Sequence, residues 1–209
     1  MTPIAYFQAT WERCAQLTAL HAYLANNTSE VLRPDEILRS EWVARVSALD
    51  LFVHELIAQR MLEIFEGRRQ PTPAYLRFQI SNETVDRIRA ATTTVDANAA
   101  YELEIRTQLS RIVYQDPEKI AEGVRLVSSV ELWNEVAIRF GASEATKTEQ
   151  AKTLKREISL IVNRRNKIAH EGDLQPALPR DPWPIHKNDL SVVKERIEKL
   201  VMAINEVVN

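Results

Sequence analysis

Apolar residues recur along most of the chain at the three- and four-residue spacing of amphipathic helices, which predicts an all-α fold. The longest predicted helix begins at Pro34, carries Asp35 and Glu36 in its first turn, and continues to Phe65 before Gly67 ends it. One cation interrupts the apolar seam of this helix, which comprises Val46, Leu49, Val53, Leu56, Arg60 and Ile64, flanked by Trp42, Val43, Ile57 and Met61.

Turn and capping residues delimit the elements before residue 145. A first helix is expected over about 4–25, with one face formed by Leu17, Leu20, His21 and Leu24, and shorter helices over 81–91 and 97–113. Asp116 as a cap and Pro117 at the first helical position predict another helix, which would continue through Trp133 to Phe140 and end at Gly141. Residues 76–80 alternate like a short strand, but a helical turn fits them as well.

Two further helices are predicted in the last third of the chain. Thr146 and Glu149 have the spacing of a capping box, and the helix that follows runs to about residue 169. Residues 171–187 contain four prolines and cannot form a regular element. Asn188 would cap a final amphipathic helix. We therefore expect one domain over 1–209, a helical bundle with long antiparallel helices and a proline-rich loop before the last helix.

Composition narrows the class of protein. The chain has 209 residues, 45% of them apolar, only 4 glycines and a formal net charge of -2, which suits a helical domain with a sizeable core. The near-neutral charge argues against a broad nucleic-acid-coating surface, so any polyanion site must be local. Cys14 is the single cysteine, either a packing residue or a nucleophile. No signal peptide or membrane span is recognised, so we expect a soluble, cytoplasmic protein without membrane association.

The helix over 146–169 carries an arginine in its apolar seam. Leu154, Ile158, Ile161, Arg165 and Ile168 follow at spacings of four, three, four and three. A buried guanidinium needs a carboxylate, a phosphate or water as a partner. A polar strip runs beside this seam and comprises Ser159, Asn163, Asn166 and His170. Five residues rotate a helix by about 500°, so Arg165 and His170 point about 140° apart. They can meet only if the last turn deforms or if a two-fold dimer supplies a second copy.

A second polar pair interrupts the long helix over 34–65. Asp50 lies one turn before His54 on a largely apolar face. Asp50 could pair with Arg165 or orient a histidine. Alternatively, Asp50 and His54 form a structural pair of their own. Glu171 and Asp173, at the end of the Arg165 helix, are interpreted as solvated helix-end acids rather than metal ligands.

Arg165 and His170, with Asn166 directly after the arginine in "RNKIAH", resemble the R-x(4–6)-H signature of HEPN domains. Arg164 gives a competing register with five intervening residues. The segment "IAHEGD" closes the helix as in many members, and "VSALDLFVHELI" is similar to the second-helix segment of the RiboL-PSP-HEPN branch. The resemblance covers about 35–65 and 150–207, which leaves 71–140 as a possible lineage-specific elaboration.

The resemblance implies a metal-independent endoribonuclease that needs no cofactor and acts as a homodimer with a composite cleft. The ribose 2′-OH would attack the adjacent phosphodiester, leaving a 2′,3′-cyclic phosphate and a 5′-OH. His170 can transfer a proton, Arg165 can hold two phosphate oxygens, and Asn166 can donate to the phosphoryl group or position His170. Arg164, Lys167, Asp50 and His54 are the expected supporting or substrate-binding residues. No spacing of histidines matches a metal site.

Local charge supports an RNA partner. Between residues 155 and 167 Glu157 is the only acid, against five cations, Lys155, Arg156, Arg164, Arg165 and Lys167. Trp183, between two prolines, either packs over the helix end or stacks on a base.

Three functions remain open. The protein could be a toxin or antiphage effector restrained by an antitoxin or a defence-system partner. It could be a non-catalytic HEPN protein that binds RNA, nucleotide or a partner. It could also be a helical interaction subunit in which Arg165 merely pairs with Asp50.

Overall fold

The computed structural model describes residues 1–28 and 34–209, and the elements in these ranges are helical. The α-helices are α1 (Pro3–Asn27), α2 (Asp35–Phe65), α3 (Asn82–Ala90), α4 (Thr94–Leu109), α5 (Pro117–Arg125), α6 (Leu132–Arg139), α7 (Lys147–Glu171) and α8 (Lys187–Val208), with a 3₁₀ turn at Tyr75–Arg77. The described ranges contain no strand, only an isolated bridge between Leu174 and Pro182. The predicted all-α class is confirmed.

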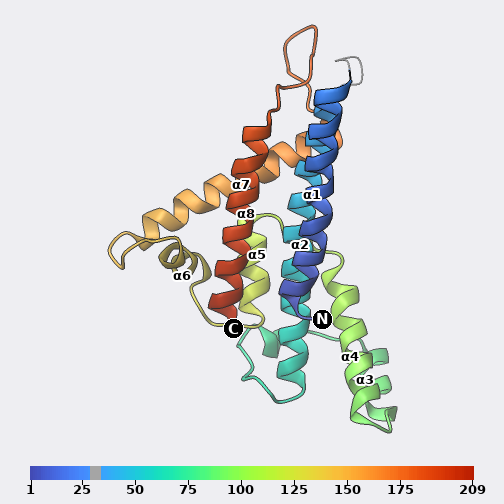
Figure 1. The fold of residues 1–209 in the computed structure, drawn as a ribbon. Helices are drawn as coiled ribbons and strands as arrows, with labels where there is room; N and C mark the ends of the chain where they lie inside the picture. The colour runs from blue at the N-terminus through green and yellow to red at the C-terminus, as the bar shows by residue number, and fades with distance from the viewer. Residues whose placement is uncertain (29–33) are drawn as a thin grey trace.

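Helix α2 is the centre of the bundle. It packs against α1, α8, α4, α7 and α5 (Figure 1). Because neighbours cover it on most sides, its interior positions are almost inaccessible, and they include Val46, Leu49, Phe52, Val53, Leu56, Ile57 and Met61. The predicted seam of this helix is therefore correct. Its one cation, Arg60, stays half-buried and pairs with Glu63, 2.5 Å away.

Helix α1 lies antiparallel to α2 along much of its length (Figure 1). The buried positions of α1 are Pro3, Phe7, Trp11, Cys14 and His21. Of the predicted face, His21 is buried and Leu17 and Leu24 are half-buried, but Leu20 is exposed, so the prediction is wrong for Leu20. Burial of Cys14 agrees with a packing role. Between the two helices, the buried Arg45 pairs with Glu41 and stacks 4.4 Å from the ring centre of Trp11.

The continuous helix predicted from Asp116 to Phe140 is wrong, because the chain bends at 126–131 between α5 and α6. The hydroxyl of Thr72 donates to the carbonyl oxygens of Arg125 and Leu126 at 2.8 and 3.0 Å, and so satisfies groups at the end of α5. The bend lets Trp133 of α6 fold back, and its indole N–H donates to the Pro117 carbonyl at 3.0 Å.

The helix caps follow the sequence in part. Asp116 caps α5 as predicted, accepting from the backbone N–H groups of Glu118 and Lys119. The capping box at Thr146 is wrong, since its hydroxyl contacts Ser143 and makes no cap bond to α7. The final helix starts after His186 rather than Asn188, with the Asp189 carboxylate accepting from the His186 N–H at 2.8 Å.

The structure also tests the predictions for residues 76–80 and for the proline-rich segment 171–187. Residues 76–80 form no strand, because Leu76 and Arg77 belong to the 3₁₀ turn and residues 78–80 are irregular. The proline-rich segment between α7 and α8 is irregular as predicted, and it projects beyond the ends of both helices (Figure 1). No helix in the described part of the chain is long and apolar enough to cross a membrane.

Candidate functional site

The C-terminal half of α7 is held against α2 by buried side chains and one tryptophan. Leu154, Ile158 and Ile161 are buried, and the Trp42 indole N–H of α2 donates to the Ile161 carbonyl at 3.0 Å. Because this hydrogen bond anchors the Ile161 carbonyl, α7 has little freedom to rotate about its own axis. The polar residues that follow on α7 are therefore presented in fixed directions.

Arg165 and Asn166 contact each other on this half of α7. One terminal nitrogen of the Arg165 guanidinium, Nη1, donates to the Asn166 side-chain oxygen at 3.1 Å, and both residues are half-buried. The Arg165 Nε is buried, and the described residues offer it no hydrogen-bond partner. No ion pair joins Arg165 to a carboxylate in residues 1–28 or 34–209, so its charge is available to an anion.

His170 lies one helical turn after Asn166 and is exposed. Residues four apart share a helix face, so the imidazole and the Asn166 amide belong to the same side of α7. The α-helix continues to Glu171, so the last turn does not deform to bring His170 toward Arg165. Within one chain the two groups therefore remain separated by the rotation expected of a regular helix.

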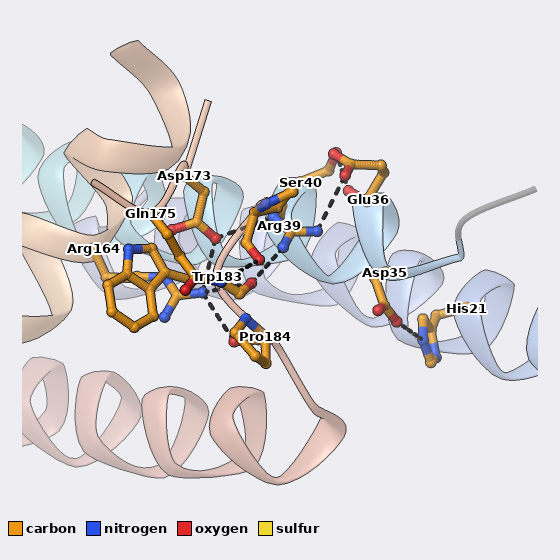
Figure 2. Close-up of polar contacts among 11 residues, drawn as sticks. His21, Asp35, Glu36, Arg39, Ser40, Arg164, Asp173, Gln175, Trp183 and Pro184 are labelled. Atoms are coloured by element: carbon orange, nitrogen blue, oxygen red, sulfur yellow. Dashed lines mark hydrogen bonds and ion pairs between the residues drawn. The ribbon is translucent and has the colours of Figure 1, made fainter. Parts of the chain in front are cut away.

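Arg164, the alternative arginine, is half-buried and paired within the chain (Figure 2). Its Nη2 lies 2.7 Å from the Asp173 carboxylate and donates to the Pro184 carbonyl at 3.1 Å. Its guanidinium carbon is 5.8 Å from the ring centre of Trp42. These contacts hold Arg164 in place, so it is poorly disposed to bind a phosphate.

Asp173 is the residue that the sequence interpretation missed. Its residue exposure is 0%, so the prediction of a solvated helix-end acid is wrong for Asp173, whereas Glu171 is exposed. Arg39 of α2 donates from Nε to the same Asp173 oxygen at 3.1 Å and from Nη2 to the Trp183 carbonyl at 2.6 Å (Figure 2). Arg39, Arg164 and Asp173 form a three-residue cluster, hereafter the Asp173 clamp. The positive φ angles of Gly172 (65°) and Asp173 (56°) turn the backbone inward.

Gly172, just past the end of α7, is the local sequence signal of this turn, because glycine readily adopts the positive φ found there. Nothing in the local sequence distinguishes Asp173 from an ordinary surface acid.

Asp50 and His54 are adjacent to each other, in a different region from Arg165. The Asp50 carboxylate accepts from the Tyr114 backbone N–H at 2.5 Å and lies 3.7 Å from the His54 Nε2. The His54 and Tyr114 rings pack edge to face, with ring centres 4.8 Å apart. Asp50 and His54 line a hollow of about 370 Å³ between α2 and α4, together with Arg106. Among the alternatives, this geometry favours the Asp50–His54 pair over a pair between Asp50 and Arg165.

The basic stripe of α7 comprises the five cations between residues 155 and 167, and pairing within the chain reduces its positive charge. Lys155 lies 2.9 Å from Glu118, and the one acid of the stripe, Glu157, lies 3.3 Å from Arg196. With Arg164 occupied by Asp173, the cations of the stripe with no ion pair in the described part of the chain are Arg156, Arg165 and Lys167. Lys167 is exposed, on the turn between Asn166 and His170.

The described residues contain no group of three or more His, Cys, Asp or Glu side chains placed to hold a metal ion. The polar side chains near the end of α7 include cations, an amide and an imidazole, which suit an anionic ligand, and one exposed acid, Glu171.

A family model described as RiboL-PSP-HEPN matches residues 12–209. The chain belongs to the RiboL-PSP-HEPN family. HEPN domains are helical and often act as ribonucleases. Membership therefore agrees with the fold and indicates a function related to RNA. Comparison with curated proteins and with solved structures gave no match. In this HEPN chain Arg165, Asn166 and His170 lie near the end of α7, with the Asp173 clamp directly beyond them.

Proposed function

We propose that this HEPN protein is a metal-independent endoribonuclease whose cleft is built by Arg165, Asn166 and His170 from two protomers. The observation that carries the proposal is the contrast between two neighbouring arginines. Arg164 is held by a buried carboxylate, whereas in residues 1–28 and 34–209 the Arg165 guanidinium hydrogen-bonds to the neutral Asn166 amide alone. A half-buried cation without a carboxylate partner is suited to a phosphate.

The chemistry requires a base at the ribose 2′-OH, an acid at the 5′ oxygen and positive charge at the phosphorus. Imidazole titrates near neutrality, so exposed His170 can take either proton role. The planar guanidinium of Arg165 can bind two non-bridging oxygens of the pentavalent phosphate, whose extra negative charge it stabilises. Asn166 already orients Arg165 and can donate its amide N–H to a phosphoryl oxygen. The products would be a 2′,3′-cyclic phosphate and a 5′-OH.

The regular end of α7 supports a dimeric cleft. Arg165 and His170 diverge by about 140° on a continuous helix, so one chain does not place both against the same phosphate. A two-fold axis near this part of α7 would bring the His170 of one protomer beside the Arg165 of the other. It would also double the local positive charge of Arg156, Arg165 and Lys167.

RNA cleavage in the presence of EDTA tests the proposal. We expect products with cyclic-phosphate ends, and we expect His170→Ala to abolish them. His186→Ala is the matched control, because His186 is also exposed and lies across the proline-rich segment without belonging to the motif. Cleavage that persists in His170→Ala, or that requires Mg²⁺, contradicts the mechanism. A strict monomer in light scattering at micromolar concentration contradicts the composite cleft.

A binding role without catalysis is the second candidate. It is favoured by one observation: no side chain among the described residues hydrogen-bonds to His170, so no orienting group is provided within one chain. Such a protein would bind RNA or nucleotide through Arg165 and leave it intact. Binding that is lost in Arg165→Ala without cleavage by the wild type would identify this role. As an active ribonuclease, the protein would serve as a toxin or antiphage effector and need a restraining partner.

A further inference from the structure

We infer that Asp173 is a positioning residue for His170, which acts by fixing the end of α7 through its buried carboxylate. The inference deepens the proposed function and rests on it for its catalytic consequence. The geometric part, that the Asp173 clamp fixes the backbone at the end of α7 that carries His170, stands on the contacts of the chain alone.

The clamp joins three separate parts of the chain at one carboxylate oxygen. Asp173 Oδ2 accepts from Arg39 of α2 at 3.1 Å and from Arg164 of α7 at 2.7 Å. The Arg39 side chain is 9% exposed and the Asp173 side chain 0%, so water screens this pair poorly, whereas the Arg164 side chain is 25% exposed. Removing the carboxylate would leave Arg39 with only the exposed Glu36 as a carboxylate partner and would leave the positive charges of Arg39 and Arg164 close together.

The backbone couples this carboxylate to the last turn of α7. The Asp173 N–H donates to the Lys167 carbonyl at 3.0 Å, closing the helix over the turn that carries His170. The Asp173 carbonyl in turn accepts from the Trp183 N–H at 2.8 Å, while Arg39 binds the Trp183 carbonyl. Backbone hydrogen bonds and side-chain ion pairs therefore both fix the position of Asp173. His170 lies three residues earlier on a helix end that this network anchors.

Stability alone is a weak explanation for such a cluster. Buried ion pairs contribute little net stability, because the cost of removing the charges from water offsets their attraction. Their directional hydrogen bonds do, however, select one geometry. The same chain offers a comparison in the buried Glu41–Arg45 pair, which lies between α1 and α2 and includes no residue of α7. A purely stabilising role predicts similar consequences for both clusters, whereas a positioning role predicts that only the Asp173 clamp affects His170.

Asp173→Asn tests the inference, with Glu41→Gln as the matched control. Both changes remove one buried negative charge while keeping the shape of the side chain. We expect Asp173→Asn to lower kcat for RNA cleavage by about 10- to 100-fold with KM changed less than about two-fold, the pattern of a displaced proton-transfer group. We expect Glu41→Gln to lower the melting temperature without changing kcat. The milder Arg39→Lys keeps the positive charge and is expected to lower kcat in the same direction.

NMR of the His170 imidazole supplies a readout that does not depend on activity. We expect the ring signals of His170 to shift or broaden in Asp173→Asn and Arg39→Lys, and to stay unchanged in Glu41→Gln. Unchanged His170 signals and unchanged kcat in folded Asp173→Asn or Arg39→Lys overturn the inference. An equal loss of kcat in Glu41→Gln also overturns it. If the wild-type protein cleaves no RNA, the proposed function fails, and the NMR comparison still decides the positioning role.

Discussion

The guanidinium of Arg164 lies 2.7 Å from the Asp173 carboxylate, whereas its chain neighbour Arg165 contacts the Asn166 amide. Adjacent residues of an α-helix point about 100° apart, so the two arginines face different surroundings. Arg164 faces the proline-rich segment and α2, where its contacts are internal. Arg165 has no carboxylate partner among the described residues.

Substitution of Arg164 should mainly affect stability, and substitution of Arg165 should mainly affect RNA cleavage. We expect Arg164→Ala to lower the free energy of unfolding by roughly 1–3 kcal/mol, because it removes a charged hydrogen bond from a buried carboxylate that Arg39 still holds. We expect Arg165→Ala to change stability by less than about 1 kcal/mol and to abolish RNA cleavage. Chemical denaturation and a cleavage assay on both variants make the measurement. The opposite assignment would follow if Arg165→Ala unfolded the protein and Arg164→Ala only lost activity.

Asp50 should behave as a structural acceptor. Tyr114 is 1% exposed, and its backbone N–H donates to the Asp50 carboxylate. Asp50→Ala leaves this donor without its partner and should cost about 1–3 kcal/mol of unfolding free energy. Asp50→Asn keeps an acceptor oxygen and should cost less. Denaturation curves measure both, and RNA cleavage per folded molecule should be unchanged. A large loss of cleavage in a stable Asp50→Asn protein would instead place Asp50 in the functional site.

Gly123 should not tolerate a side chain. A Cβ at this position of α5 would lie 2.3 Å from the Ile57 side chain and 2.6 Å from the Tyr114 ring. Such overlap forces buried neighbours to move, so we expect Gly123→Ala to destabilise the protein by about 1–3 kcal/mol despite the better helix propensity of alanine. Thermal unfolding checks this expectation. Gly67→Ala is unsuitable as a control because of its positive φ, so an exposed helical site such as Ser191→Ala serves instead.

Glu104 should make the docking of α3 on α4 depend on pH. The hydrogen bond from the Gln108 amide, and those from Thr84 and Ser81, lower the pKa of Glu104 from its ordinary value of 4.5, while burial opposes them. A lowered pKa contributes stability that is present above the ordinary pKa and is lost as the pH falls through the folded value. The melting temperatures of wild type and Glu104→Gln should therefore differ most near neutral pH and converge below about pH 4.5.

A control for the acid effect is Glu83→Gln, which removes an exposed pair with Arg87 on α3. Exposed pairs contribute little, so this variant should follow the wild type across the pH range. A constant difference between wild type and Glu104→Gln down to pH 3 would mean that ionisation of Glu104 does not stabilise the fold.

Local patterns were sufficient for most helices and failed where a distant group intervened. The extent of α2 followed from Pro34, the acidic first turn and Gly67, all of which act on neighbouring backbone groups. The break between α5 and α6 depends on the Thr72 hydroxyl, 53 residues before the carbonyl that it binds. Periodicity in the sequence contains no information about such a contact.

The sequence by itself determined that α7 carries Arg165, Asn166 and His170 near its end, because helical spacing fixes which residues share a face. It left open which of the two adjacent arginines is free, and it assigned Asp173 to solvent. Only the tertiary structure decided both points, since Arg39 approaches Asp173 across 134 residues and the proline-rich segment closes over them. A carboxylate at a helix end is solvated by default, and it becomes an internal anchor only when folding brings buried cations to it.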